Sequence, residues 1–231
     1  MPGFSPRFAS LPLALALGIT GPAAAAEPPP APEKAPITVE VGAHVGFAHR
    51  FGDGPSLPVA GRLGGVFGLT AAVSPWSRAS VGLGWEHTTV GSERGRGDLA
   101  DVDVRRSLDV FWASARLFVM RTDRFGFFVE LGPGLAIQHA VADVLVYPAP
   151  GAQVTTYRCS ESGGPGVALR AGLGIEAKIV GPLWFTADTV FDHVQASSAA
   201  LGDCVPGAGS LALLGMRFGL TYRRDMSRWL R

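Results

Sequence analysis

The chain has 231 residues, of which 47% are hydrophobic and 17% are charged, and its formal net charge is +1. Residues 1–26 contain one base, Arg7, and no acid, so their removal leaves 20 − 1 = 19 basic residues against 19 acidic ones. Proteins that bind nucleic acid or other polyanions usually carry an excess of basic residues, and the remaining chain has none. No nucleic-acid partner is therefore expected.

The first 26 residues have the pattern of a secretory signal peptide. Arg7 precedes an apolar run from Leu11 to Ile19, and four alanines at residues 23–26 supply the small side chains of a cleavage site. The apolar run is too short to span a bilayer as a helix. Residues 27–36 are rich in proline, which favours an extended chain, and we interpret them as a tether. The mature protein is therefore expected to be exported.

The hydropathy pattern beyond residue 36 is typical of β-strands. Apolar and polar residues alternate, and glycines interrupt the apolar segments, where each would cost a helix up to about 1 kcal/mol relative to alanine. Several segments alternate for long enough to cross a hydrocarbon layer as tilted strands. The pattern predicts strands at residues 37–51, 60–74, 79–91, 104–120, 125–146, 166–180, 183–196 and 210–224.

The connections between these strands alternate in length. The even-numbered ones are tight turns, at Ser74–Ser77, Arg121–Arg124 and Val180–Pro182. The odd-numbered ones are longer and polar or glycine-rich, at Phe51–Val59, Ser92–Asp103, Tyr147–Pro165 and Ser197–Gly209. In an up-and-down meander, all short turns then lie at one end and all long loops at the other, as in barrels of the bacterial outer membrane.

The polar face of the strands differs from the surface of a soluble protein. It carries paired glycines, which are poor on an exposed strand but leave room for large side chains inside a narrow barrel. The pairs are Gly42 and Gly46, Gly64 and Gly68, Gly82 and Gly84, Gly132 and Gly134, Gly172 and Gly174, and Gly215 and Gly219. The opposite face is apolar, for example at Leu83, Leu131 and Leu173, and we assign it to lipid.

Ionisable residues of both signs lie between the glycines. Because a buried charge without a partner is costly, the mixture predicts ion pairs inside a closed lumen. The predicted lumen network comprises Glu40, Arg62, Glu86, Arg116, Glu130, Arg170, Glu176, Lys178, Asp188 and Arg217. Segment 104–120 leaves two alternatives open: Leu108, Val110 and Trp112 share a parity with Arg116, so either a bulge intervenes or large apolar groups point inward.

Aromatic residues gather towards both ends of the strands, which predicts belts at the two membrane interfaces. Those near the short turns or the C-terminus are Trp76, Phe125, Phe127, Trp184, Phe185, Tyr222 and Trp229. Those towards the long loops are Phe47, Phe51, Phe111, Tyr147 and Phe191.

In these features the chain resembles the small outer-membrane β-barrels of the OmpA/OmpX kind, a class that includes opacity-type surface proteins. The resemblance covers about residues 37–224 and rests on pattern rather than on a diagnostic motif. It implies an all-β, eight-stranded antiparallel up-and-down transmembrane β-barrel in the bacterial outer membrane, with a short C-terminal tail at 225–231. Members often end on a terminal aromatic in the last strand, whereas this sequence runs on past Tyr222.

The two cysteines and one short segment are candidates for chemistry. Cys159 and Cys204 fall in neighbouring long loops, so an oxidising exported setting predicts a disulfide between them. Within residues 191–198, His193 precedes Ser197 and Ser198 by four and five positions. Lipid A deacylases, barrels of similar size, space His and Ser two apart; a separation of four places them about 13 Å apart in a strand. No enzymatic activity is expected.

The other histidines, His44, His49, His87 and His139, are scattered over three predicted strands without the close spacing of metal ligands. We expect neither a metal site nor another cofactor.

The sequence favours a structural or surface-adhesive role through the long extracellular loops. The expected partners are outer-membrane lipid and lipopolysaccharide, together with a surface receptor contacted by the loops, and the protein is expected to be a monomer. Two alternatives stay open: a narrow pore, and an exported soluble barrel that holds an apolar ligand and inverts every facing assignment. A lipid A deacylase is the least favoured function.

Overall fold

The computed structural model describes residues 37–52, 57–147 and 153–226. The predicted signal peptide, the tether and residues 227–231 of the predicted tail lie outside these ranges. The strands are β1 (Thr38–Phe51), β2 (Val59–Gly61), β3 (Leu63–Trp76), β4 (Ala79–Arg96), β5 (Ala100–Arg121), β6 (Phe125–Val146), β7 (Thr155–Ser162), β8 (Gly166–Val180), β9 (Leu183–Gln195), β10 (Ala200–Leu201), β11 (Val205–Pro206) and β12 (Ser210–Asp225). Among the described residues, no helix has the length and apolarity to cross a membrane.

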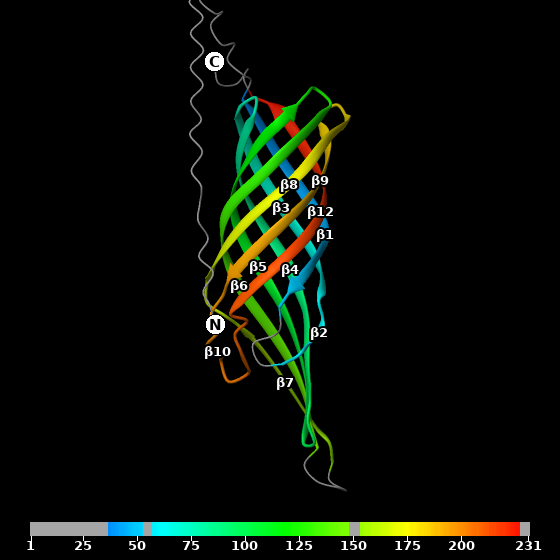
Figure 1. The fold of residues 1–231 in the computed structure, drawn as a ribbon, viewed down its shortest axis with the longest axis vertical. Coiled ribbons are helices and arrows are strands. Elements are labelled where there is room, and N and C mark those ends of the chain that lie inside the picture. Colours follow the sequence, from blue (N-terminus) through cyan, green and yellow to red (C-terminus); the bar gives the residue numbers. More distant parts are fainter. Residues whose placement is uncertain (1–36, 53–56, 148–152, 227–231) are drawn as a thin grey trace, which may run out of the picture. The chain divides into compact units, whose positions relative to one another are not determined.

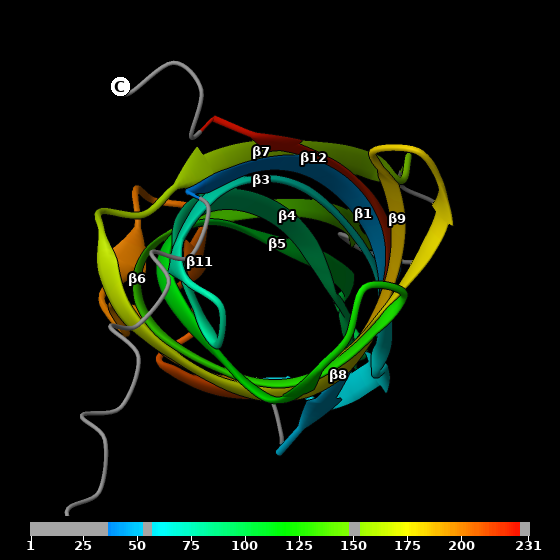
Figure 2. The same cartoon turned by 90° about the horizontal axis from the view of Figure 1, so that it is seen from above.

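Eight of the described strands form a closed antiparallel ring (Figures 1 and 2). Its order is β1, β3, β4, β5, β6, β8, β9 and β12, so each strand pairs with its neighbours in this series. The ring closes between β1 and β12, which pair from Thr38 opposite Asp225 to Phe51 opposite Ala212. The predicted up-and-down barrel is therefore confirmed, and β6 and β8 have the predicted bounds.

Local chemistry explains the tight turns at one end of the barrel. Between β5 and β6, the Thr122 hydroxyl accepts hydrogen bonds from the backbone N–H groups of Arg124 and Phe125, at 3.4 and 3.0 Å. Between β8 and β9, Gly181 has a φ of 52°, in the left-handed region that glycine adopts at little cost. These turns join neighbouring strands without a long loop.

The opposite end differs from the prediction of irregular loops. Strands β4 and β5 continue through most of the predicted loop Ser92–Asp103, and Gly97 N–H bonds to Ala100 C=O at 2.9 Å in the connection between them. The predicted loop Tyr147–Pro165 contains β7, which pairs with the distal part of β6. Together with β2, these strands form a sheet in the order β2, β4, β5, β6, β7 that extends beyond the ring. We call it the upper sheet; in Figure 1 it lies at the bottom of the picture.

The fourth long connection folds back against the strands. We call residues 196–209 the lid; they contain the short β10–β11 hairpin, and Leu201, Val205 and Ala208 are buried. The predicted disulfide is confirmed, because Cys204 of the lid is bonded to Cys159 of β7, with Cα atoms 5.8 Å apart. The lid is thus covalently joined to the upper sheet.

Candidate functional site

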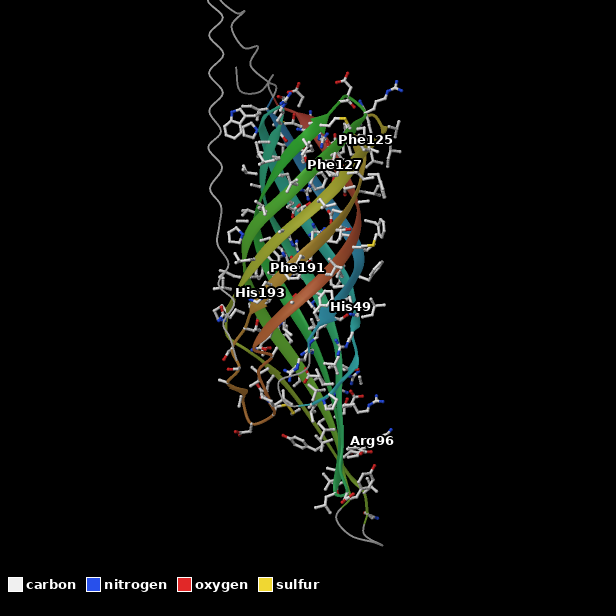
Figure 3. The ribbon with its side chains drawn as sticks, in the orientation of Figure 1. His49, Arg96, Phe125, Phe127, Phe191 and His193 are labelled. Atoms are coloured by element: carbon white, nitrogen blue, oxygen red, sulfur yellow. A yellow bond between two sulfur atoms is a disulfide. The ribbon has the colours of Figure 1, made fainter. Side chains whose placement is uncertain are left out.

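The outer surface of the barrel is apolar over its middle section. Leu83 is 69% exposed, Leu63 66% and Leu131 54%, which is the reverse of a soluble barrel. Phe125 and Phe127 lie towards the short turns, and Phe191 lies towards the long loops (Figure 3). An apolar exterior on a ring without edges is the arrangement of a membrane-spanning barrel.

Two predicted belt residues lie elsewhere, and one lies outside the described residues. Trp184 is buried inside the barrel, where the Arg223 guanidinium stacks 4.1 Å from its ring. Tyr147 follows β6 on the upper sheet, and its hydroxyl donates to Asp101 at 3.2 Å. Trp229 falls within residues 227–231. The two aromatic belts therefore contain fewer residues than the sequence predicts.

The lumen contains a group of ion pairs near the short turns, which we call the basal cluster: Glu40, Arg121, Glu176 and Arg223. Arg223 Nε lies 2.8 Å from Glu40 Oε1, and its Nη2 lies 2.5 Å from Glu176 Oε2. Arg121 contacts the same two carboxylates, at 3.2 and 3.3 Å. Two acids and two bases from four strands therefore balance one another across the lumen.

A second group, the central cluster, lies further into the barrel and comprises Glu86, Arg116, Glu130, Arg170, Asp188, Asp192 and Arg217. Arg217 lies at its middle and contacts Asp188 at 2.6 Å, Glu86 at 3.0 Å and Glu130 at 3.5 Å. Arg170 binds Asp192 with two nitrogens, each at 2.7 Å. Such bidentate pairs fix side-chain geometry as well as charge.

An apolar layer lies beyond the central cluster, on the side of the long loops. Trp112 is 4% exposed, and the Arg170 guanidinium stacks 4.0 Å from its ring. The register of β4 with β5 shows no shift between Leu108 and Arg116, so the large apolar groups of β5 point inward without a bulge. The layer comprises Val90, Leu108, Val110, Trp112, Ala136, Ala168, Val194, Ala208, Leu211 and Leu213.

A third set of charges, the upper cluster, lies on the same side of the barrel: Arg50, Glu93 and Arg106. Glu93 is fully buried and accepts hydrogen bonds from Arg50 at 2.8 Å and from Arg106 at 3.1 Å. The lid is attached nearby through the buried Gln138 side chain, which accepts from Ala208 N–H at 2.8 Å and donates to Ser197 C=O at 3.0 Å.

The predicted network residues separate into two groups. Eight lie in the basal or central cluster: Glu40, Glu86, Arg116, Glu130, Arg170, Glu176, Asp188 and Arg217. Arg62 is exposed between β2 and β3, and Lys178 is exposed and lines the open mouth at the short-turn end. Both lie close to strand ends, where inward and outward positions are no longer distinct in the alternation pattern.

Sequence reasoning missed Arg50, Glu93, Arg106, Arg121 and Arg223. Register shifts explain two of them. The shift between Thr89 and Ser92 brings Glu93 inward at an odd position, and a shift between Phe118 and Met120 does the same for Arg121. Gly91, with a φ of 85°, is the sequence signal for the first shift. Arg50 and Arg223 follow the regular alternation of their strands and were recoverable.

The paired glycines make room for the large inward side chains. A Cβ at Gly134 would lie 2.7 Å from Cε3 of Trp112, and one at Gly174 would lie 2.6 Å from Cζ of Phe128. The space that remains is small: a void beside Glu40, Thr70 and Arg116 holds about 10 Å³, at the lower limit for one water. Side chains therefore fill most of this lumen.

The segment considered for hydrolysis does not form a paired site. His193 lies on an outward position of β9 (Figure 3), whereas Ser197 and Ser198 follow the strand in the lid. The contact that Ser197 makes to the barrel is through its carbonyl oxygen, to Gln138. Within the described residues, no group of three or more His, Cys, Asp or Glu side chains is arranged to hold a metal ion.

Comparison with known proteins finds likeness in solved structures only. No family model matches the chain. No curated protein matches it either. Neisserial surface protein A is 12% identical over 80% of this chain and 96% of its own, with a TM-score of 0.47. A major outer membrane protein from Thermus thermophilus is 14% identical over 81% and 99%, with a TM-score of 0.45.

The attachment invasion locus protein Ail of Yersinia pestis is 16% identical over 80% of this chain and 98% of its own, with a TM-score of 0.40. Ail has also been solved in complex with the heparin analogue sucrose octasulfate. This chain is similar to these small outer-membrane barrels in fold.

Proposed function

We propose that this protein is an integral β-barrel of the bacterial outer membrane that presents the upper sheet to the exterior of the cell as an adhesive surface. One observation carries the proposal: three ring strands, β4, β5 and β6, continue beyond a side-chain-filled barrel and form, with β2 and β7, a sheet that a disulfide joins to the lid. Continued strands hold a contact surface more rigidly than irregular loops do, so binding costs less conformational entropy.

The apolar exterior and the predicted signal peptide support the membrane assignment. The ring leaves its membrane-spanning strands without free edges, which is the condition for β-structure in lipid. An exported soluble barrel with an apolar ligand would need the opposite facing, with apolar groups inside and charges outside. Leu83, Leu131 and Leu173 are instead exposed, while Glu86 and Arg217 are buried.

The filled lumen argues against a pore. An eight-stranded interior is just wide enough for side chains to fill. Here the basal cluster, the central cluster and the apolar layer follow one another along the lumen, and the lid packs at the end with the long loops. An ion would have to displace all of these groups in order to cross.

The upper sheet has ion pairs on its outer face and exposed apolar side chains near its tip. On its outer face, Arg94 contacts Asp103 at 3.1 Å, and Asp143 contacts both Arg105 and Arg158. The large apolar groups near the tip include Leu99, 68% exposed, Val154, 54%, and Tyr157, 57%. Exposed aromatic and aliphatic groups of this kind are typical of surfaces that contact proteins.

The adhesion of cells that display the barrel tests this proposal. A variant with Leu99→Ser, Val154→Ser and Tyr157→Ser is expected to reduce adherence to cultured epithelial cells to the level of cells without the protein. The control variant, Asp98→Asn with Gln153→Ala, changes exposed polar positions beside the same residues and should adhere like the wild type. Equal adherence of the two variants would contradict an adhesive tip.

Two measurements on refolded protein test the barrel itself. Unboiled samples should migrate differently from boiled ones on SDS gels, because a closed barrel resists the detergent. Planar bilayers should show no steady single-channel steps. Protein that stays soluble and monomeric without detergent, or that conducts steadily, would contradict the membrane assignment or the filled lumen, respectively.

A further inference from the structure

A chain of hydrogen bonds on the outer wall joins four strands. His139 of β6 has its Nε2 2.8 Å from Asp109 Oδ2 of β5, and its Nδ1 2.7 Å from Ser162 Oγ of β7. His87 of β4 lies 2.9 Å from the other oxygen of Asp109. The strand register creates this chain, because His87 is paired directly with Asp109 and His139 with Ser162. Two histidines that lie far apart in the sequence thus share one carboxylate.

The partners determine where the protons lie. A carboxylate only accepts hydrogen bonds, so the Nε2 of His139 must carry the hydrogen that faces Asp109. The Nδ1 of a neutral imidazole is then an acceptor, and it faces the Ser162 hydroxyl. The result is a serine hydroxyl aimed at a base that a carboxylate orients, and both distances lie in the range for proton transfer.

We call the hydrogen-bonded set of Asp109, His139 and Ser162, together with His87, the relay. It adjoins a cavity at the edge of the apolar outer surface of the barrel. A cavity of about 360 Å³ is lined by His87, His139, Leu63, Val141 and Arg105, among others. Further along β5 and β6, towards the short turns, the outward positions become apolar; they include Phe111 and Leu135, which are 51% and 58% exposed. In a membrane this level is the interface where acyl chains join their headgroups.

We infer that Ser162, His139 and Asp109 form a hydrolytic site for the ester bonds of acyl chains in membrane lipids. This activity goes beyond the adhesive role, which uses the tip of the upper sheet. Ser162 is exposed, and the His139 and Asp109 side chains are 36% and 23% exposed, so a lipid can reach the serine. Arg105 also lines the cavity, and its guanidinium is paired with Asp143.

The reaction has two balanced steps. In the first, Ser162 Oγ attacks the ester carbonyl carbon while His139 Nδ1 takes the hydroxyl proton. The carbon–oxygen bond of the ester breaks, the leaving alkoxide receives that proton from His139, and an acyl-serine remains. In the second, His139 takes a proton from water, which attacks the acyl-serine; Ser162 regains a proton, and the free carboxylic acid leaves.

Labelling with a biotinylated fluorophosphonate tests the nucleophile in refolded full-length protein. The probe is expected to modify Ser162 of the wild type, identified by peptide mass, and to leave Ser162→Ala and His139→Gln at background. Ser160→Ala is the matched control, because Ser160 lies on the same face of β7 two residues earlier and should not affect labelling. Absence of labelling in the wild type, or equal labelling of Ser162→Ala, would overturn the inference.

Release of fatty acid identifies the lipid. The wild type is reconstituted into phosphatidylglycerol vesicles or mixed with purified lipopolysaccharide, and released acids are measured by mass spectrometry. Release from the vesicles assigns glycerophospholipid as the substrate, and release from lipopolysaccharide assigns its ester-linked acyl chains; Ser162→Ala should abolish either. Release from neither would overturn a lipid ester substrate. Gel shift and adhesion do not depend on Ser162, so this failure is distinguishable from failure of the proposed function.

Discussion

The two halves of the lumen are filled in different ways. Towards the short turns, the basal and central clusters hold charged side chains that, apart from Arg121, lie on the regular alternation of the ring strands. Towards the long loops, the apolar layer and the lid pack like the core of a soluble protein. One barrel therefore combines a charge-paired half, filled by ion pairs between ring strands, with a half in which the apolar layer and the lid pack beside the upper cluster.

Loss of one central charge should have the largest effect. Arg217→Met leaves Asp188, Glu86 and Glu130 with one cation fewer in a buried site, which should lower the free energy of unfolding by about 3–5 kcal/mol. Urea unfolding in lipid vesicles, followed by tryptophan fluorescence, measures this change. Arg94→Met, at the exposed pair with Asp103, should cost less than about 1 kcal/mol. Similar losses of stability in both variants would mean that the central cluster is no more sensitive to the loss of a charge than an exposed ion pair.

A cavity in the apolar layer should have the next largest effect. Leu211 is 1% exposed, and Leu211→Ala should lower the free energy of unfolding by about 3 kcal/mol. The control is Leu83→Ala on the outer face, where lipid chains fill the space and the loss should be smaller. If the outer substitution costs as much in the same unfolding assay, the upper half is not packed as a core.

Overpacking should have an intermediate effect. Gly134→Ala would place a methyl group 2.7 Å from the Trp112 ring and should cost about 1–3 kcal/mol. Gly65→Ala is the control, because a Cβ there would lie 4.0 Å from the nearest atom, Oγ1 of Thr89. Thermal unfolding of the two refolded variants would show whether space beside Trp112 limits the choice of residue; a silent Gly134→Ala would show that it does not.

Release of the lid should have the smallest effect on global stability. Cys204→Ser removes the covalent link to β7, and the ring should lose less than about 1 kcal/mol because the lid opens locally. Proteinase K should cleave residues 196–209 faster in this variant. Gln138→Leu, which removes both side-chain hydrogen bonds to the lid, should act in the same direction. Unchanged cleavage in both variants would mean that other contacts hold the lid.

The ring and most of the charge-paired half could be predicted from the sequence. Long alternating segments fix which residues share a face, so Glu86, Arg170 and Arg217 were assigned to the lumen without knowledge of their partners. Apart from β6, which was predicted as far as Val146, the upper sheet could not be predicted, because its strands are exposed to water on parts of both faces and polar residues interrupt the alternation. The bulge at Gly91 also reverses the parity of the residues that follow it.

The relay on the outer wall could not be predicted from the sequence either, for a different reason. His87, Asp109, His139 and Ser162 come together only through the register of neighbouring strands, and β7 was not predicted at all. A shift of one residue between any two of these strands would move a partner to the other face. Spacing along the chain therefore could not reveal a site built across strands.

The seam between β1 and β12 has a consequence for how the protein is made. Because the first and last strands of the ring pair along fourteen residues of β1, no intermediate that lacks β12 can satisfy both edges of the sheet. In hydrocarbon an open edge would leave backbone groups without partners, at a cost of several kcal/mol each. Insertion must therefore follow synthesis of the last strand, and contacts of very long sequence separation should make this step slow.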